Sequence, residues 1–148
     1  MTRSEILEIL APCGLNCRKC LSCSQGEIKR LAVELQAALG NFDGYAERFS
    51  RIKPAFAGYP QFKELLAHLT TGACAGCRRA AACYPGCGVA PCCRAKGVDF
   101  CGECPDFPCD HSNLDENLKR RWLEMSARIR EIGAEAYYAE TKELPRYR

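Results

Sequence analysis

The chain has 148 residues, a common length for one domain, and contains no run of 18 apolar residues that would predict a membrane span. Its formal net charge is only +3, and thiolates bound to metal would lower it further, so the charge gives little support to nucleic-acid binding. Thirteen residues are cysteine, and this odd number cannot pair completely within one chain.

The first residues indicate the compartment. A secretory signal needs an uninterrupted apolar stretch, and Glu5 and Glu8 lie where that stretch would be. We therefore expect a cytoplasmic protein with reduced thiols. In such a protein, a high density of cysteine is typical of metal binding and not of a disulfide framework. We also expect a single domain over residues 1–148.

A helix is predicted after the first cysteines. Ser24 and Glu27 form a capping box, and apolar residues then recur at helical spacing up to Gly40. These apolar residues are Ile28, Leu31, Leu35 and Leu39. Two shorter helices are predicted over residues 43–52 and 60–72, because Pro and Gly residues delimit them.

The segment from residue 73 to 108 shows no helical or strand period. It is rich in glycine and proline and carries most of the cysteines. Such a long segment is predicted to form loops and knuckles, which burial of apolar side chains alone would not order. We therefore expect bound metal to hold this segment in place.

A second long helix is predicted in the last part of the chain. Ser112 or Asn113 would cap it, and Gly133 would end it. Its apolar face consists of Leu114, Leu118, Trp122, Met125, Ile129 and Ile132. We interpret this face as core, although a partner-binding helix is an alternative. A short helix over residues 134–140 is expected to follow, with Tyr137 or Tyr138 packed inward.

The spacing of the cysteines predicts metal binding. Four C-x-x-C pairs occur, and they are Cys17 with Cys20, Cys20 with Cys23, Cys74 with Cys77, and Cys101 with Cys104. Two intervening residues allow a tight turn to direct both sulfurs at one ion, and tetrahedral Zn²⁺ takes two such pairs. The thirteen cysteines could fill three such sites at most, and we expect two.

Iron–sulfur chemistry is the alternative. Cys17-x2-Cys20-x2-Cys23 has the opening spacing of a bacterial ligand run for a [4Fe-4S] cluster, but the closing cysteine of that run is absent. A cluster here would need its fourth ligand from the distant cysteine-rich segment. The same thiolates would then serve electron transfer or redox sensing.

Three motifs together carry a family resemblance. They are Cys13-Gly-Leu-Asn-Cys17-Arg-Lys-Cys20, Cys74-Ala-Gly-Cys77-Arg78, and Lys96-Gly-Val-Asp-Phe-Cys101-Gly-Glu-Cys104-Pro-Asp-Phe-Pro-Cys109. With them the chain resembles DUF3795, an uncharacterised family of cysteine-rich bacterial and archaeal proteins. The resemblance implies a metal-binding domain and no particular reaction. The metal ligands that it implies are Cys13, Cys17, Cys20, Cys74, Cys77, Cys87, Cys92, Cys101, Cys104 and Cys109. Cys23, Cys83 and Cys93 are additions to that pattern.

Catalytic chemistry finds little support in the sequence. A catalytic zinc site needs an open position and a nearby base, and only two histidines are present. His68 lies on a predicted helix, whereas His111 could replace a thiolate ligand. No cysteine is paired with a positioned base, so we expect no catalytic residue.

The partners are left open. An unidentified protein partner is possible, and no contact with a membrane is expected. The basic residues near the cysteines also allow nucleic-acid binding, although solvated helix faces explain them equally well. These residues are Arg78, Arg79, Arg94, Lys96, Lys119, Arg120 and Arg121. We therefore predict a mostly α-helical domain with cysteine-rich knuckles, which binds structural zinc and is not an enzyme.

Overall fold

Helices account for most of the protein. The computed structural model describes residues 1–80 and 83–147. Within those residues the chain forms no β-strand, and an isolated antiparallel bridge joins Leu10 to Asn16. The mostly α-helical prediction is confirmed. None of the helices in this part of the chain is both long and apolar enough to cross a membrane.

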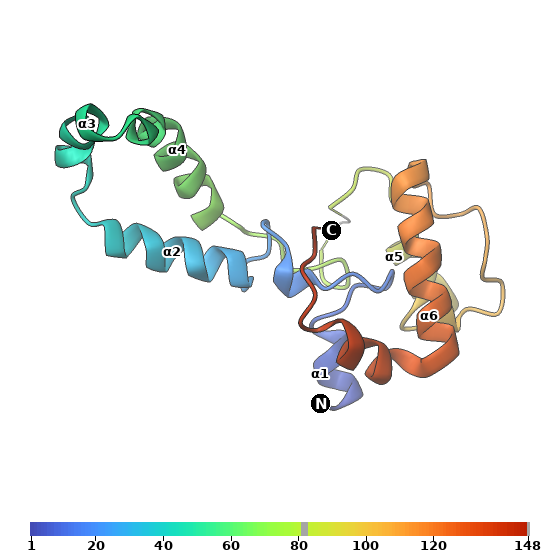
Figure 1. Ribbon diagram of the computed structural model, residues 1–148. Helices are drawn as coiled ribbons and strands as arrows, with labels where there is room; N and C mark the ends of the chain where they lie inside the picture. Colours follow the sequence, from blue (N-terminus) through green and yellow to red (C-terminus); the bar gives the residue numbers. More distant parts are fainter. Residues whose placement is uncertain (81–82, 148) are drawn as a thin grey trace. The chain divides into compact units, whose positions relative to one another are not determined.

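The chain divides into two compact units. We call residues 1–19 with 74–148 the cysteine unit, and residues 20–73 the arm. The cysteine unit contains α1 (Arg3–Leu7), the 3-10 turn η1 (Cys17–Lys19), α5 (Val89–Lys96), the 3-10 turn η3 (Cys101–Glu103) and α6 (Glu116–Thr141). The arm contains α2 (Glu27–Leu39), α3 (Asp43–Ile52), the 3-10 turn η2 (Pro54–Gly58) and α4 (Tyr59–Thr70) (Figure 1). The prediction of one domain stays a prediction, since two compact units can also be parts of one domain.

Helix α6 supplies much of the buried surface of the cysteine unit. Its buried side chains include Trp122, Met125 and Ile129, on the face that the periodicity predicted. Asp115 caps the helix, because its carboxylate accepts a hydrogen bond from the N–H of Leu118 at 3.0 Å.

The predicted caps Ser112 and Asn113 are wrong. The carbonyl of Ser112 accepts a hydrogen bond from the N–H of Gly88 at 2.9 Å, which holds this residue in the core. Asn113 has a φ of 51°, whereas a helix cap normally has extended backbone. Because the chain turns through these residues, the helix begins only after Asp115.

A kink at Gly133 divides α6. This glycine has φ 81° and ψ 159°, a conformation that side chains on an L-residue rarely allow. The helix predicted to end near Gly133 and the helix predicted over residues 134–140 are therefore the two halves of α6, which bends at Gly133. Tyr137 packs inward, as one of the two predicted choices, and its hydroxyl donates to the carbonyl of Gly14 at 3.2 Å.

Two hydrophobic clusters form the core of the cysteine unit. One brings α1 and residues Leu10 and Phe100 against both halves of α6. The other surrounds Trp122 with Val89, Phe107 and several cysteines. Cysteine therefore replaces part of the aliphatic core.

The predicted loop over residues 73–108 is wrong in part, because it contains α5. Val89, Ala90 and Cys93 form the buried side of this helix. Pro91 occupies its first turn, where a missing N–H costs no intrahelical hydrogen bond. The flanking glycines and this proline are typical of a loop, so this helix of eight residues was not predicted. The short helix α1 was not predicted either, although Thr2 and Glu5 form a capping box at its start.

The helices of the arm follow the predicted spacing closely. Helix α3 has the predicted bounds, and α4 begins one residue before Pro60. Helix α2 ends at Gly40 as predicted, but it begins after Gly26, and the side chain of Ser24 does not cap it. The predicted capping box is therefore wrong.

The C-terminal tail is hydrogen-bonded to the segment around Asn16 and Lys19 in the cysteine unit. The guanidinium of Arg146 donates to the carbonyl of Asn16 at 3.0 Å. The ammonium of Lys19 donates to the carbonyl of Leu144 at 2.9 Å. These bonds fasten the C-terminal tail to the loop that carries the first cysteines.

Candidate metal centre

The loop that carries Cys13 and Cys17 is folded tightly against α6. The N–H of Ala11 donates to the carbonyl of Leu15 at 2.9 Å, and the N–H of Cys17 donates to Ile9 at 2.8 Å. Gly14 turns the chain with a φ of +88°, and a Cβ there would lie 3.0 Å from a methyl group of Ile129. The Cys13-Gly pair therefore combines a thiol with a turn that only glycine fits.

We define the first thiol group as Cys13, Cys17, Cys77 and Cys87. The thiol of Cys17 donates a hydrogen bond to the sulfur of Cys77, which raises the pKa of Cys17 and lowers the pKa of Cys77. Burial raises the pKa of Cys13 to about 12, and the neighbouring thiols of Cys77 and Cys87 act in the same direction. The group thus joins the first cysteine segment to residues that follow it by about sixty positions in the sequence.

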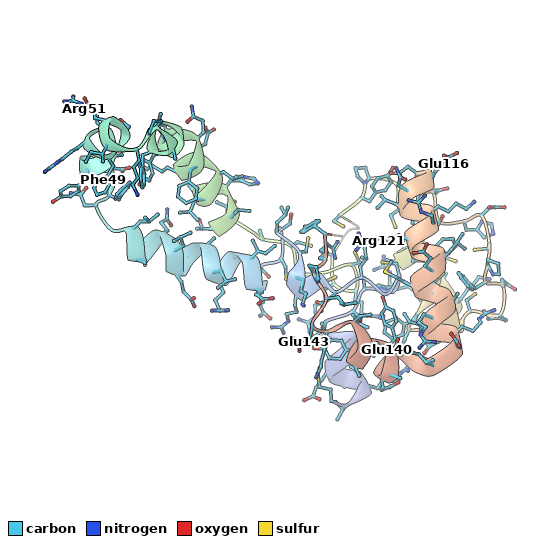
Figure 2. The ribbon with its side chains drawn as sticks, in the orientation of Figure 1. Phe49, Arg51, Glu116, Arg121, Glu140 and Glu143 are labelled. Atoms are coloured by element: carbon cyan, nitrogen blue, oxygen red, sulfur yellow. The ribbon has the colours of Figure 1, made fainter. Side chains whose placement is uncertain are left out.

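We define the second thiol group as Cys92, Cys93, Cys101, Cys104 and Cys109. Helix α5 contributes two of them, and the turn η3 with the following loop contributes the others. The thiol of Cys93 donates a hydrogen bond to the sulfur of Cys101, which raises the pKa of Cys93 and lowers the pKa of Cys101. Burial raises the pKa of Cys92, and the thiols of Cys101, Cys109 and Cys104 add to this effect. Figure 2 shows sulfur atoms in the loops beside α5.

The turn at Cys101 and Cys104 has the compact form that the C-x-x-C spacing predicted. The N–H of Cys104 donates to the carbonyl of Cys101 at 3.1 Å, and both residues are buried. The guanidinium of Arg130 reaches over from α6 and donates to the carbonyls of Gly102 and Phe107, at 2.8 Å each, and to that of Cys104. One charged side chain therefore fixes the path of this loop.

The two remaining predicted ligands, Cys20 and Cys74, lie outside the two groups, and so does Cys23, which the family pattern set apart. Cys20 is the first residue of the arm, and Cys23 is buried near it, with its N–H donating to the carbonyl of Cys20 at 3.1 Å. Cys74 belongs to the cysteine unit, and its sulfur accepts a hydrogen bond from the N–H of Gly76 at 3.4 Å. Conversely, Cys93 was set apart by the family pattern, yet it contacts Cys101.

The thiols do not form a completed metal site. In residues 1–80 and 83–147, the His, Cys, Asp and Glu side chains form no group of three or more that could hold an ion. No disulfide joins the cysteines either, all thirteen of which lie in the described residues. The predicted metal-binding knuckles are therefore not shown. Two pairs of thiols interact by hydrogen bonds, Cys17 with Cys77 and Cys93 with Cys101.

Two buried hydrogen-bond donors beside the thiols indicate whether metal-bound thiolates would fit their surroundings. The Nη2 of Arg78 and the indole Nε1 of Trp122 are both buried, and neither has a hydrogen-bond partner of normal geometry among the described residues. The hydrogen bond from Cys93 has the largest effect on the pKa of Cys101 and lowers it. The indole N–H of Trp122 also lowers the pKa of Cys101, by a smaller amount. Arg78 donates through Nε to Leu10 at 3.0 Å, and its charge acts on the thiols of both groups.

Unpaired buried donors of this kind fit a neighbouring anion. A buried N–H without an acceptor costs free energy, and a metal-bound thiolate is an acceptor that carries negative charge. Four thiolates on a divalent ion leave a net charge of about −2, which a nearby guanidinium would offset. The donor set and its surroundings are thus compatible with metal.

Several basic residues proposed for nucleic-acid binding are held in ion pairs. Arg79 pairs with Glu8, Lys96 with Asp106, and Lys119 with Asp110. His68 is exposed on α4, and His111 is exposed in the loop before α6. Neither histidine belongs to a thiol group.

The comparison with protein families matches residues 9–114 to DUF3795, described as a protein of unknown function. The chain belongs to this family. The match spans the first cysteines, the arm and both thiol groups, so the resemblance that the sequence motifs indicated is confirmed. The comparisons with curated proteins and with solved structures give no match.

Proposed function

We propose that this DUF3795 protein is a non-enzymatic metal-binding domain in which cysteine thiolates hold structural Zn²⁺. The observation that carries the proposal is the meeting of thiols from distant segments, as in the pair of Cys17 and Cys77. Cys17 and Cys77 lie outside the α-helices, in segments that have few aliphatic side chains to order them. A metal ion would provide the missing cross-link.

Each thiol group contains enough sulfur for one tetrahedral site. Cys13, Cys17, Cys77 and Cys87 would hold one ion, with Cys74 as a further candidate from the family pattern. The four family-pattern residues of the second group would hold the other, and these are Cys92, Cys101, Cys104 and Cys109.

The surroundings of the groups support an anionic centre. Arg78 acts on Cys17 and Cys93, and its buried Nη2 has no acceptor of normal geometry within the described chain. Trp122 directs its buried indole N–H toward Cys101 of the second group. Hydrogen bonds of this kind to metal-bound sulfur would orient the ligands and stabilise their charge. A reducing compartment would keep the thiols available, and we propose the cytoplasm.

Metal analysis tests the proposal. Protein purified anaerobically without added metal should contain two zinc ions per chain and should be colourless. Cys77→Ser and Cys104→Ser, one in each group, should each lower the content to about one ion. Cys23→Ser is the matched control, because Cys23 is buried like Cys104 but lies outside both groups, and it should retain both ions.

Other outcomes would decide against structural zinc. A brown protein that contains iron and acid-labile sulfide, and loses them in Cys23→Ser, would favour the [4Fe-4S] alternative with an electron-transfer or redox-sensing role. Protein that contains no metal, and keeps its melting temperature in a chelator, would refute both forms of the proposal.

A further inference from the structure

The arm leaves many apolar side chains in contact with solvent. Among the described residues, nine of the twelve large apolar side chains that are exposed belong to residues 20–73. The buried apolar residues of the arm are only Cys23, Ala32 and Leu66. A helical unit of this size with so little core is marginal by itself.

Helices α2 and α4 run antiparallel in the arm. The end of α4 lies beside the start of α2, since the ammonium of Lys29 donates to the carbonyl of Gly72 at 2.8 Å. Figure 1 shows the chain leaving along α2 and returning along α4. Ala32 and Leu66, each 5% exposed, mark the sides on which the two helices face each other.

Four of the five large exposed apolar residues of α2 and α4 lie on one side of this pair. Leu31 and Leu65 each precede the buried residue by one position, which is a rotation of about 100° in the same sense. In two antiparallel helices that face each other, equal rotations lead to the same side of the pair. Leu35 and Phe62 lie between these positions and the seam, so we call these four residues the apolar face.

The exposures of the two sides support this assignment. Leu31 and Leu35 are 48% and 44% exposed, and Phe62 and Leu65 are 42% and 58% exposed. The opposite side is different in character, because Lys29 and Lys63 lie near the seam there. Val33, 46% exposed, also lies on that opposite side, one position after Ala32.

The border of the apolar face indicates the kind of partner. Glu27 and Glu34 follow around α2, and Gln61 and His68 follow around α4, all of them exposed. Membrane-binding helices instead place Lys and Arg beside their apolar residues, where they meet anionic lipid. Glu34 is paired with Arg30 at 2.7 Å, so the border carries no excess of positive charge that would attract an anionic lipid surface or nucleic acid, and it favours a protein surface.

We propose that the apolar face binds the same face of a second copy of this chain, in a two-fold symmetric dimer. The face itself is uncharged, so two copies meet without repulsion at its centre. A two-fold rotation can set the glutamates at the α2 border against Gln61 and His68 at the α4 border. Residues 20–73 contain six basic and five acidic side chains, which leaves the arms nearly neutral. Paired helical hairpins of this kind form four-helix layers, and two-fold dimers are the commonest oligomers.

The mass of the full chain in solution tests the proposal. Under reducing conditions, with the metal that the protein retains on purification, light scattering should give the mass of two 16.4 kDa chains. Leu31→Lys and Leu65→Lys should each weaken dimerisation at least tenfold and give a monomer. Val33→Lys is the matched control, because it places the same charge on the same helix at similar exposure, and it should remain dimeric.

A monomeric wild-type chain at about 100 µM would overturn the proposal, including the case in which another protein or the chain's own cysteine unit covers the face. Equal dissociation of Val33→Lys and Leu31→Lys would also overturn it. Circular dichroism of each variant monitors helix content. If a lysine variant loses helix, Leu65→Gln replaces it, because glutamine favours helices and still removes apolar surface.

Discussion

Arg130 shows how one side chain can organise a loop that has no regular structure. Its guanidinium satisfies the carbonyls of Gly102, Cys104 and Phe107, and it also lies over the ring of Phe107, 5.1 Å from the centroid. Hydrogen bonds to a charged group are stronger than those between neutral groups. The position of Cys104 therefore depends on a residue of α6 that binds no metal itself.

Replacement of Arg130 by alanine should destabilise the protein by roughly 2 kcal/mol, since three carbonyls lose a charged donor. Thermal unfolding of the metal-loaded protein would measure this change as a lower melting temperature. Arg128→Ala is the control, because Arg128 lies on the same helix but pairs only with the exposed Glu131 and Glu140. Similar losses in both variants would contradict the role assigned to Arg130.

The residues that carry the chemistry were predictable in part. Local spacing identifies the thiols, because a C-x-x-C turn needs only four consecutive residues, and the turn at Cys101 has that form. The partners of the thiols could not be predicted in this way. Arg78 and Trp122 approach the sulfurs through tertiary packing, and no local pattern relates them to Cys17 or Cys101. The same reason explains why the contact of Cys93 with Cys101 was missed.

At the scale of elements, backbone contact fixes η3 on α6. A Cβ built on Gly102 would lie 2.2 Å from the carbonyl oxygen of Ser126 and 3.2 Å from the N–H nitrogen of Arg130. Both neighbours are backbone atoms, which cannot turn aside as a side chain would. The turn with Cys101 and Cys104 can therefore approach the helix only because Gly102 lacks a side chain.

Gly102→Ala should accordingly cost at least about 2 kcal/mol of stability, through separation of η3 from α6. Chemical denaturation monitored by Trp122 fluorescence would measure it, since this tryptophan packs in the same cluster. Gly58→Ala is the matched control, because no atom lies within 4 Å of its added Cβ and its φ is negative. A neutral effect of Gly102→Ala would mean that the two elements are packed less closely than described.

Helical period predicted the elements well where apolar residues recur over several turns. Helix α2 and the buried face of α6 follow this pattern. Short elements were lost, because glycine and proline around α5 give the same signal as a loop. The capping box at Ser24 failed for another reason. Consecutive turns lead from Cys20 through Cys23 to Gly26, where a Cβ would lie 2.9 Å from the Cβ of Cys23, so the helix begins only after Gly26.

At the scale of the whole molecule, the two units are stabilised by different means. The cysteine unit combines two hydrophobic clusters with the thiol groups, whereas the arm has few buried residues. Local opening is easiest where few apolar contacts are buried. The response of the chain to metal removal should therefore differ between the units.

Hydrogen exchange should show this difference. Removal of metal with a chelator should increase amide exchange most in residues 74–109, because these loops would lose their cross-links. Helices α3 and α4 contain none of the thiols and should change little. Exchange that is unaffected between residues 74 and 109, or that rises equally in α3 and α4, would show that metal does not order the loops.

The chain forms the cysteine unit from its first and last residues, with Tyr137 and Arg146 bonded to the loop around Gly14 and Asn16. During translation, Cys13 and Cys17 leave the ribosome long before these partners are made. At roughly 5–20 residues per second, the interval is on the order of 10 s. The arm is completely synthesised well before that time. The thiols synthesised first are therefore the last to be enclosed.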